Sequence, residues 1–437
     1  MIIISIIGTI LSFVLMLAGK TAFIWAPIVL MYTGFQLWHH FVTERFVLGM
    51  TWTLFEIEVP RDVEKSPLAM ELIFTNAMYH ASQKGLWEIW IQGAPHFWFS
   101  LEIAGFNGEV HFYIRSPSRI RDLVETQVYA QYPQAKVKEV EDYTLSVPFD
   151  APNDDWYVWG AEWKLLNDDA LPLRTYKDYG LDQPSDKETL KIDPLTPTIE
   201  YLGALKRGQQ VWIQHVVRPS LKSYHGHGHG EPKHHGWVDE AHAVMERMLD
   251  PYRQYRLQEG GPKAGTYASE VRAPRTIEEK MEKIREKIAK LGFDVGIRLM
   301  CVADARFNTV EDFNGLRRSS RLMFRQYNAP DSNSLVRINA TQFDSPFADP
   351  TGLAIWKLKN RTLNWYRLRI FYHPPLWYSF DYGPTITAFT GAKPLVISVL
   401  NVEELATLFH FPGQVSQAPS FKRVESRVAK PPSNLPM

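Results

Sequence analysis

Two stretches decide the architecture of this 437-residue chain: IIISIIGTILSFVLMLA, from Ile2 to Ala18, and TAFIWAPIVLMYTGFQLW, from Thr21 to Trp38. Neither contains a charged residue, and Lys20 is the single charge between them. A helix needs about 20 apolar residues to cross a bilayer, with about 17 as the lower limit. The sequence therefore predicts a transmembrane helical hairpin over residues 1–45, so the membrane is the first expected partner.

Two other interpretations of this region stay open: a single anchor with an interfacial helix, and a cleaved signal peptide. A signal peptide has a basic first segment and a small-residue cleavage site, and neither is evident here. Trp38, Trp52 and the His39–His40 pair are typical of a membrane interface. Basic residues after the second segment favour cytoplasmic ends. We expect a multi-pass protein of the plasma (inner) membrane with cytoplasmic soluble domains.

The composition limits the functional classes to which the rest of the chain can belong. Lys+Arg and Asp+Glu are both 48, so the formal net charge is zero and the body is not that of a dedicated nucleic-acid-binding protein. We expect nucleic acid to be bound only indirectly or weakly. Cys301 is the single cysteine, which excludes a disulfide framework and suits a reducing compartment. Hydrophobic residues at 45% predict packed cores rather than disorder.

The first soluble region, residues 53–147, reads as a ferredoxin-like domain. Its elements follow the order βαββαβ, which is typical of that arrangement. The Asn107–Gly108 pair predicts a tight hairpin turn between the middle strands, and Ser66–Pro67 predicts a helix start. In order, we expect strand 53–59, helix 66–83, strand 97–104, strand 110–114, helix 116–132 and strand 135–140.

The second region, residues 153–415, reads as another α+β domain, and a degenerate second copy of the first fold is one interpretation. We expect strands over 156–165, 209–217, 293–303 and 363–372, and helices over 276–291 and 307–327. A His/Gly-rich loop occupies 222–236, and a Pro-rich tail or linker occupies 416–437. The whole chain is therefore predicted to be α+β.

The His/Gly-rich loop is the one metal-binding candidate. Neutral imidazole is a good ligand for zinc, nickel or copper. A functional site needs ligands held on rigid elements, whereas these histidines alternate with glycine, so we expect no metal and no cofactor. A metal-binding protein or metalloenzyme built on the His225–His242 segment stays as the alternative. Its weak candidate ligands are His225, His227, His229, His234 and His235.

A basic helix face is the candidate interaction surface. Arg318, Arg321 and Arg325 are spaced i, i+3, i+7, which places them on one face of a helix. Such a face could contact nucleic-acid phosphate, anionic lipid or an acidic protein. A solubilising face whose charges pair with carboxylates would give the same pattern.

The chain lacks the motifs of the common catalytic classes. Gly260 to Thr266 reads GGPKAGT, without the spacing of a P-loop, and no Gly-x-Ser-x-Gly elbow occurs. Cys301 lies within an apolar strand and reads as a core residue rather than a nucleophile. We therefore expect no enzymatic activity.

Several segments resemble one bacterial family. They are EVPRDVEKSPLAME (58–71), FYIR (112–115), RDLVE (121–125), YAQYP (129–133) and NVEELATLFHFPG (401–413). The chain resembles the membrane-anchored, amino-terminal region of type IV secretion or conjugative-transfer ATPases, TraG-like and HerA-like, along nearly its whole length. In that family a Pro-rich linker such as Pro431–Pro436 leads into a P-loop motor domain. The resemblance implies a motor on a separate polypeptide or a split or truncated gene.

Two functional hypotheses from different classes follow. The first is a non-enzymatic, membrane-anchored component of a translocation system, which docks or assembles with a separate P-loop ATPase and could form homo-oligomers. The second is the membrane-bound metal protein that uses the His225–His242 segment. Stoichiometric metal that survives dialysis and disappears with His225, His227 and His229 would favour the second hypothesis.

Overall fold

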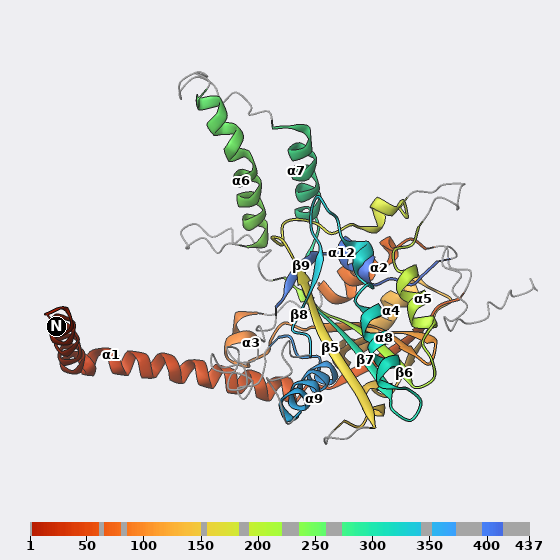
Figure 1. The fold of residues 1–437 in the computed structure, drawn as a ribbon, viewed down its shortest axis with the longest axis horizontal. Helices are drawn as coiled ribbons and strands as arrows, with labels where there is room; N and C mark the ends of the chain where they lie inside the picture. The colour runs from red at the N-terminus through yellow and green to blue at the C-terminus, as the bar shows by residue number, and fades with distance from the viewer. Residues whose placement is uncertain are drawn as a thin grey trace, which may run out of the picture. The chain divides into compact units, whose positions relative to one another are not determined.

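The computed structural model describes residues 2–60, 65–79, 85–149, 155–182, 192–220, 236–258, 273–341, 352–372 and 396–413. The chain divides into two compact units. Among the described residues, the first unit comprises the chain up to Met50 and the segment 85–96, and the second comprises the rest. Figure 1 shows the elements of both units.

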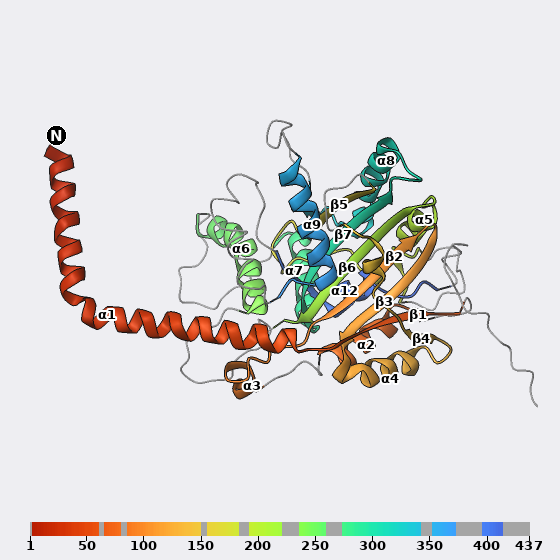
Figure 2. The same cartoon turned by 90° about the horizontal axis from the view of Figure 1, so that it is seen from below.

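The first unit consists of α1 (Ile2–Leu48) and the short helix α3 (Leu86–Trp90). The predicted hairpin over 1–45 is not present, because α1 is one continuous helix of 47 residues. Gly19 and Lys20, which separate the two apolar stretches, are themselves helical, so the chain does not reverse there. Figure 2 shows that α1 bends without folding back on itself.

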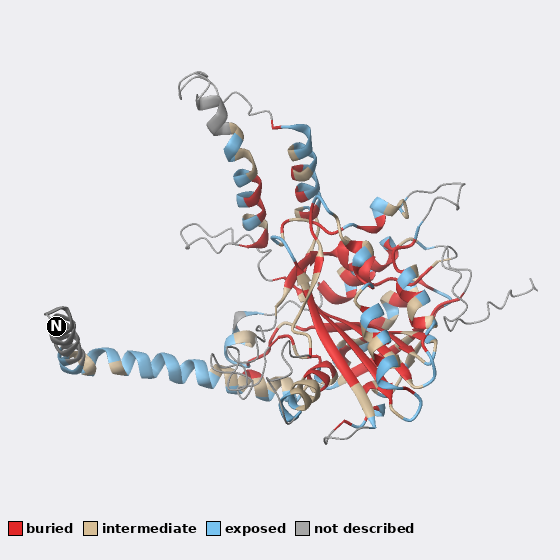
Figure 3. Cartoon of the chain, in the orientation of Figure 1, coloured by how far each residue is buried: buried red, intermediate tan, exposed pale blue. Residues whose placement is uncertain are grey.

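Part of α1 has the length and composition of a membrane span. In the part of α1 with described side chains, Gly19–Leu48 is 30 residues long, and an 18-residue window within it has a mean hydropathy of 1.2. Its apolar side chains are exposed along the helix, as Figure 3 shows. One candidate span is therefore present there, near the N-terminus, and the structure does not support the predicted multi-pass arrangement.

The second unit is built on one nine-stranded antiparallel sheet. Along the sheet the order is β4-β1-β3-β2-β6-β7-β5-β8, and β9 pairs with β7 at one end. The strands are β1 (Trp52–Glu58), β2 (Phe99–Phe106), β3 (Glu109–Pro117), β4 (Lys136–Glu139), β5 (Trp156–Leu165), β6 (Gln209–Pro219), β7 (Gly292–Asp304), β8 (Leu335–Ile338) and β9 (Ser398–Asn401).

The first four strands and their helices follow the predicted element order. Helix α2 (Leu68–Ile73) continues as a π-helical turn over Phe74–Tyr79, and α4 (Arg121–Gln131) precedes β4. The predicted turn joins β2 to β3, with φ of 53° at Asn107 and 92° at Gly108. These left-handed values are the ones that Asn-Gly hairpin turns supply.

The next four strands repeat the same order from the opposite end of the sheet, β8-β5-β7-β6. Helix α5 (Thr196–Gly203) precedes β6, and α8 (Val310–Ser320) precedes β8. Between β6 and β7 the chain inserts α6 (Trp237–Gln258) and α7 (Arg275–Ile288). Strands β2 and β6 pair along eight residues, so the ranges predicted as separate domains, 53–147 and 153–415, share one sheet.

Two predicted elements of the second half were wrong. The segment 363–372, predicted as a strand, lies largely in helix α9 (Leu353–Leu368), whose buried face includes Leu363 and Tyr366. Aromatic residues raise strand propensity, but packing on the sheet decides the outcome. The helix predicted over 307–327 ends at Ser320 and is followed by a separate 3₁₀ turn over Arg325–Tyr327.

Helices cover both faces of this sheet. On β2, a Cβ added to Gly105 would lie 3.0 Å from the Cβ of Leu202, so α5 packs closely there. On β5, a Cβ added to Gly160 would lie 2.9 Å from Thr362 of α9. The strand register places these two glycines on opposite faces. The sheet core is therefore buried between α5 on one side and α9 on the other.

Candidate functional site

The histidines of the predicted loop, His225, His227, His229, His234 and His235, lie outside the described residues. His242, at the end of that segment, is exposed on α6. Among the residues that the structure describes, no group of three or more His, Cys, Asp or Glu side chains could hold a metal ion.

The structure does not place the three predicted arginines on one helix face. Arg318 is exposed on α8, Arg321 is the half-buried residue just after its end, and Arg325 is exposed in the following 3₁₀ turn. The i, i+3, i+7 argument fails because the helix ends at Ser320.

A different cluster of basic residues forms where α8 and α9 approach each other. Arg317 of α8 lies close enough to Arg318, Arg321 and Lys359 for their charges to interact. Burial and the neighbouring Arg321 and Arg318 lower the pKa of Arg317, and burial and Arg317 lower the pKa of Lys359. Lys359 comes from α9, so a sequence window around α8 could not include it.

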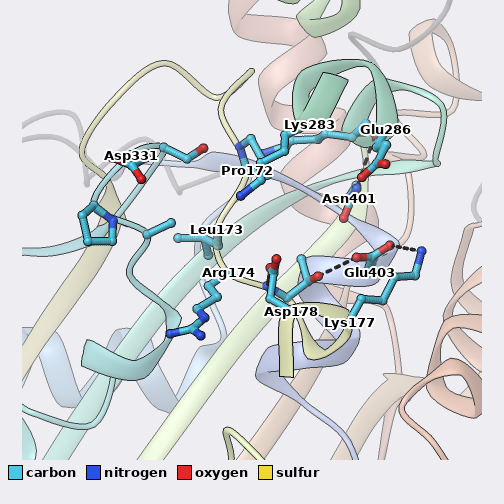
Figure 4. A pocket seen from close by; sticks show the side chains of 15 residues that line it. Pro172, Leu173, Arg174, Lys177, Asp178, Lys283, Glu286, Asp331, Asn401 and Glu403 are labelled. Carbon is cyan, nitrogen blue, oxygen red and sulfur yellow. Dashed lines mark hydrogen bonds and ion pairs between the residues drawn. The ribbon is translucent and has the colours of Figure 1, made fainter. Parts of the chain in front are cut away.

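One cleft in the described part of the second unit is lined by charged side chains. Its volume is about 330 Å³, within the usual range for small-ligand sites or a few side chains of a partner. Four segments meet there: the chain around Leu173–Asp178, helix α7, the turn at Ala329–Ser332 and the start of α12 (Val402–Leu408). Figure 4 shows Lys283 and Glu286 on one side and Arg174 and Lys177 on the other.

Glu403 organises the charged groups of this cleft. Its carboxylate accepts a hydrogen bond from Oγ1 of Thr175 at 2.6 Å, and ion pairs join it to Lys177 at 2.9 Å and Lys290 at 2.7 Å. Lys290 also pairs with Glu71 of α2 at 2.9 Å. Burial raises the pKa of Glu403, but these three donors outweigh it and hold the pKa below its ordinary value.

A fully buried ion pair forms the floor of the cleft. Nζ of Lys287 lies 3.0 Å from Oε2 of Glu404, and both side chains have zero exposure. Glu404 also accepts from the backbone N–H groups of Leu173 at 2.7 Å and Asn401 at 2.8 Å. In return its own N–H donates to Oδ1 of Asn401, which completes a capping box at the start of α12. Three chain segments are thereby fixed around one carboxylate: α7, the chain at Leu173 and the start of α12.

A second buried charge network lies where α9 ends over the sheet. Arg369, in a left-handed conformation with φ of 53°, donates to both carboxylate oxygens of Glu102 at 2.9 and 3.0 Å. It also pairs with Asp142, and Tyr143 donates to Glu102 at 2.8 Å. Burial raises the pKa of Glu102, but Arg369 and these hydrogen bonds bring it below the ordinary value. The Arg369–Glu102 pair is closed to solvent, since both side chains have zero exposure, whereas Asp142 at the edge of the network is 26% exposed.

Cys301 lies in β7 with no exposed surface, and burial raises the pKa of its thiol to about 12. A thiol in this state is a poor nucleophile at neutral pH, in agreement with its reading as a core residue. Among these charge clusters, the one around Glu403 lines a cleft whose rim carries the exposed side chains of Lys283 and Glu286, and it is therefore the candidate functional site.

No site was predicted at this cleft from the sequence, although the sequence does contain one local pattern that belongs to it. Asn401 and Glu404 are spaced as a capping box, which marks a helix start. No sequence pattern pairs Glu403 with Thr175 or Lys177, which lie more than 220 residues earlier in the chain.

The Glu403→Gln variant should be less stable than the parent by about 1.5–3 kcal/mol at neutral pH, because it loses hydrogen bonds that involve charged groups. The pKa of Glu403 is depressed in the folded state, so its contribution is present above the unfolded pKa of about 4.3 and is lost as pH falls through the folded value. Urea unfolding in detergent at several pH values measures this. A gap between parent and variant that stays constant down to pH about 2 would contradict the assignment.

The structure thus defines an α+β protein with an apolar N-terminal helix, one antiparallel sheet and a charge-lined cleft on the sheet unit. A family described as a domain of unknown function (DUF8128) matches residues 81–366, which is more than half of the chain, and the chain belongs to this family. The match runs from the segment of α3 through α9 and includes three of the four segments that line the cleft. No curated protein matches the chain.

Proposed function

We propose that this chain is a non-enzymatic, membrane-anchored component of a type IV secretion or conjugation-like translocation system, which docks or assembles with a separate P-loop ATPase. The observation that carries the anchoring is the apolar surface of Gly19–Leu48, where Phe23, Leu30 and Met31 are each at least 70% exposed. Exposed apolar side chains over 30 residues are costly in water and favourable in lipid. The anchor lies in the inner membrane and the sheet unit lies in the cytoplasm.

The docking part of the proposal is supported by the cleft around Glu403. Charged groups at a rim give specificity and steer association with a partner of complementary charge. On the rim, Lys283 and Glu286 are exposed on α7. The segment 401–413, which carries part of the resemblance to the secretion family, supplies Glu403 to this cleft.

We also propose that each half of the sheet is a ferredoxin-like βαββαβ unit, and that the second half is a degenerate copy of the first. The orders β4-β1-β3-β2 and β8-β5-β7-β6 support this relation. Such a fold hosts many functions, so the proposed role rests on the anchor and the cleft.

Affinity purification of the tagged full-length protein from detergent-solubilised membranes tests the proposal. We expect a P-loop ATPase to co-elute in near-stoichiometric amount. The Lys283→Glu variant, which reverses a charge on the cleft rim, should lose most of this partner. Arg285→Glu is the matched control, because Arg285 is exposed on the same helix and is absent from the cleft lining.

Two results would contradict the proposal. One is a protein that elutes alone from its native membranes. The other is ATP hydrolysis by the purified chain that disappears when a residue of the chain itself is changed. Equal loss of the ATPase in the Lys283 and Arg285 variants would reject the cleft as the docking site while leaving the anchored role intact.

A further inference from the structure

Helix α3 packs on α1 through aromatic rings. The ring of Trp90 lies 4.9 Å from the ring of His39 and 5.9 Å from the ring of Phe35, centroid to centroid. Nε2 of His39 lies 3.3 Å from the carbonyl oxygen of Ile89, within hydrogen-bond distance. Helix α3 therefore contacts the turn of α1 that contains Phe35 and His39.

The chain after α3 approaches the backbone of α1 closely. Gly93 has a φ of 66°, and a Cβ at this position would come within 2.7 Å of the backbone of Val42 and Thr43. Only glycine permits both this conformation and this approach. Helix α3 is thus attached to α1 at two levels, by Trp90 and by Gly93.

This arrangement leaves a set of large apolar side chains exposed beside α1. Trp87 is 67% exposed, Trp90 is 45% exposed and Ile91 is 42% exposed. On α1 itself, Trp38 is 42% exposed and Phe41 is 59% exposed. Tryptophan has an apolar ring and a polar N–H, a combination that favours the boundary between lipid and water.

The level of these rings matches one end of a membrane span. Gly19–Trp38 contains 20 residues, which is about 30 Å of helix and about the thickness of the hydrocarbon core. Beyond Trp38 the helix carries its first charged residues after Lys20, namely Glu44 and Arg45 in its last turns. Glu88 of α3 accepts a hydrogen bond from the N–H of Gly85 at 3.0 Å, so its carboxylate caps the start of α3.

We propose that α3 and the residues that follow it lie in the headgroup layer of the bilayer that α1 crosses, with Trp87 and Trp90 as interfacial anchors that fix the depth of α1. This inference rests on the membrane anchoring proposed above and adds a second lipid-binding element to it. The partner of this surface is a lipid bilayer, because its exposed side chains are aromatic and apolar and are continuous with those of the candidate span.

Depth-dependent quenching of a fluorophore tests the inference in the full-length protein, reconstituted into phosphatidylcholine–phosphatidylglycerol vesicles. An environment-sensitive dye is attached to Trp87→Cys, to Leu30→Cys in the candidate span, and to Leu145→Cys in the sheet unit. Leu30 and Leu145 are both 70% exposed, which makes them matched controls. Cys301 is buried and should not react.

We expect lipids spin-labelled near the headgroup to quench the dye at position 87 several-fold more strongly than lipids labelled near the bilayer centre. The dye at position 30 should show the reverse order, and the dye at position 145 should respond only to aqueous iodide. If position 87 behaves like position 145 while position 30 stays in lipid, the inference is overturned and the anchor stands. If position 30 also responds only to iodide, the proposed anchoring itself fails.

Discussion

Replacing Arg369 with methionine should lower the free energy of unfolding by about 3–5 kcal/mol, the usual cost of removing one partner from a buried ion pair. Glu102 would then remain at zero exposure without the charge that now meets both of its oxygens. Ser100, Tyr143 and Gln214 would still donate to Glu102, but neutral donors offset only part of the desolvation of a carboxylate.

Chemical unfolding of the full-length protein in detergent measures this change. The matched control is Arg306→Met, since Arg306 also pairs with an aspartate, Asp304, but is 73% exposed. Because the guanidinium of Arg306 is exposed to water even though Asp304 is only 6% exposed, its loss should cost about 0–1 kcal/mol. The double variant Glu102→Leu with Arg369→Met should recover part of the lost free energy of unfolding. In this variant the carboxylate that would be buried without its counter-ion is removed together with the arginine. Equal effects of Arg369→Met and Arg306→Met would contradict the role assigned to the network.

Glu404→Gln should cost about 3 kcal/mol or more, because Lys287 would keep its charge at zero exposure with no counter-ion on its neighbour. The amide has nearly the shape of the carboxylate, so the variant changes charge with little change in volume. Leu173 and Asn401 now donate to different oxygens of Glu404, and the single amide oxygen of glutamine can replace only one of them. We expect the cleft floor to loosen as well.

The control for this variant is Glu279→Gln, which removes a carboxylate from the exposed i, i+4 pair with Arg275 on α7. It should change stability by less than about 0.5 kcal/mol. Hydrogen exchange of the α12 amides reports the local effect. Unchanged protection of α12 in Glu404→Gln, together with unchanged global stability, would show that the pair does not fix this helix.

Local patterns in the sequence predicted the first half of the sheet well. Alternation in β1 and β3 and the Asn107–Gly108 turn are signals carried by neighbouring residues, and each corresponds to an element of the structure. Helix α9 was missed for the opposite reason, since its aromatic residues suit a strand locally and are helical because they pack on the sheet. The hairpin prediction failed because Gly19 and Lys20, where the turn was expected, continue the helix.

The charged sites could not be predicted because they join distant parts of the chain. Glu102 and Arg369 are separated by 267 positions, and Leu173 and Glu404 by 231. Pairing of β2 with β6, which merges the two halves, is equally invisible in either strand alone. The predicted arginine surface lies on one helix, whereas the basic cluster in the structure also contains Lys359 from a second helix, α9.

The two halves of the sheet differ in the connection between their second and third strands. Two residues, Asn107 and Gly108, connect β2 to β3, whereas the equivalent connection from β6 to β7 runs from residue 220 to residue 291 and carries α6 and α7. The strands on either side are antiparallel neighbours, and the entropic cost of closing a loop rises slowly with its length. The length of the inserted segment therefore has little effect on the pairing of these strands. The tip of this hairpin should therefore accept an insertion as large as two helices without a change in the pairing of β6 with β7.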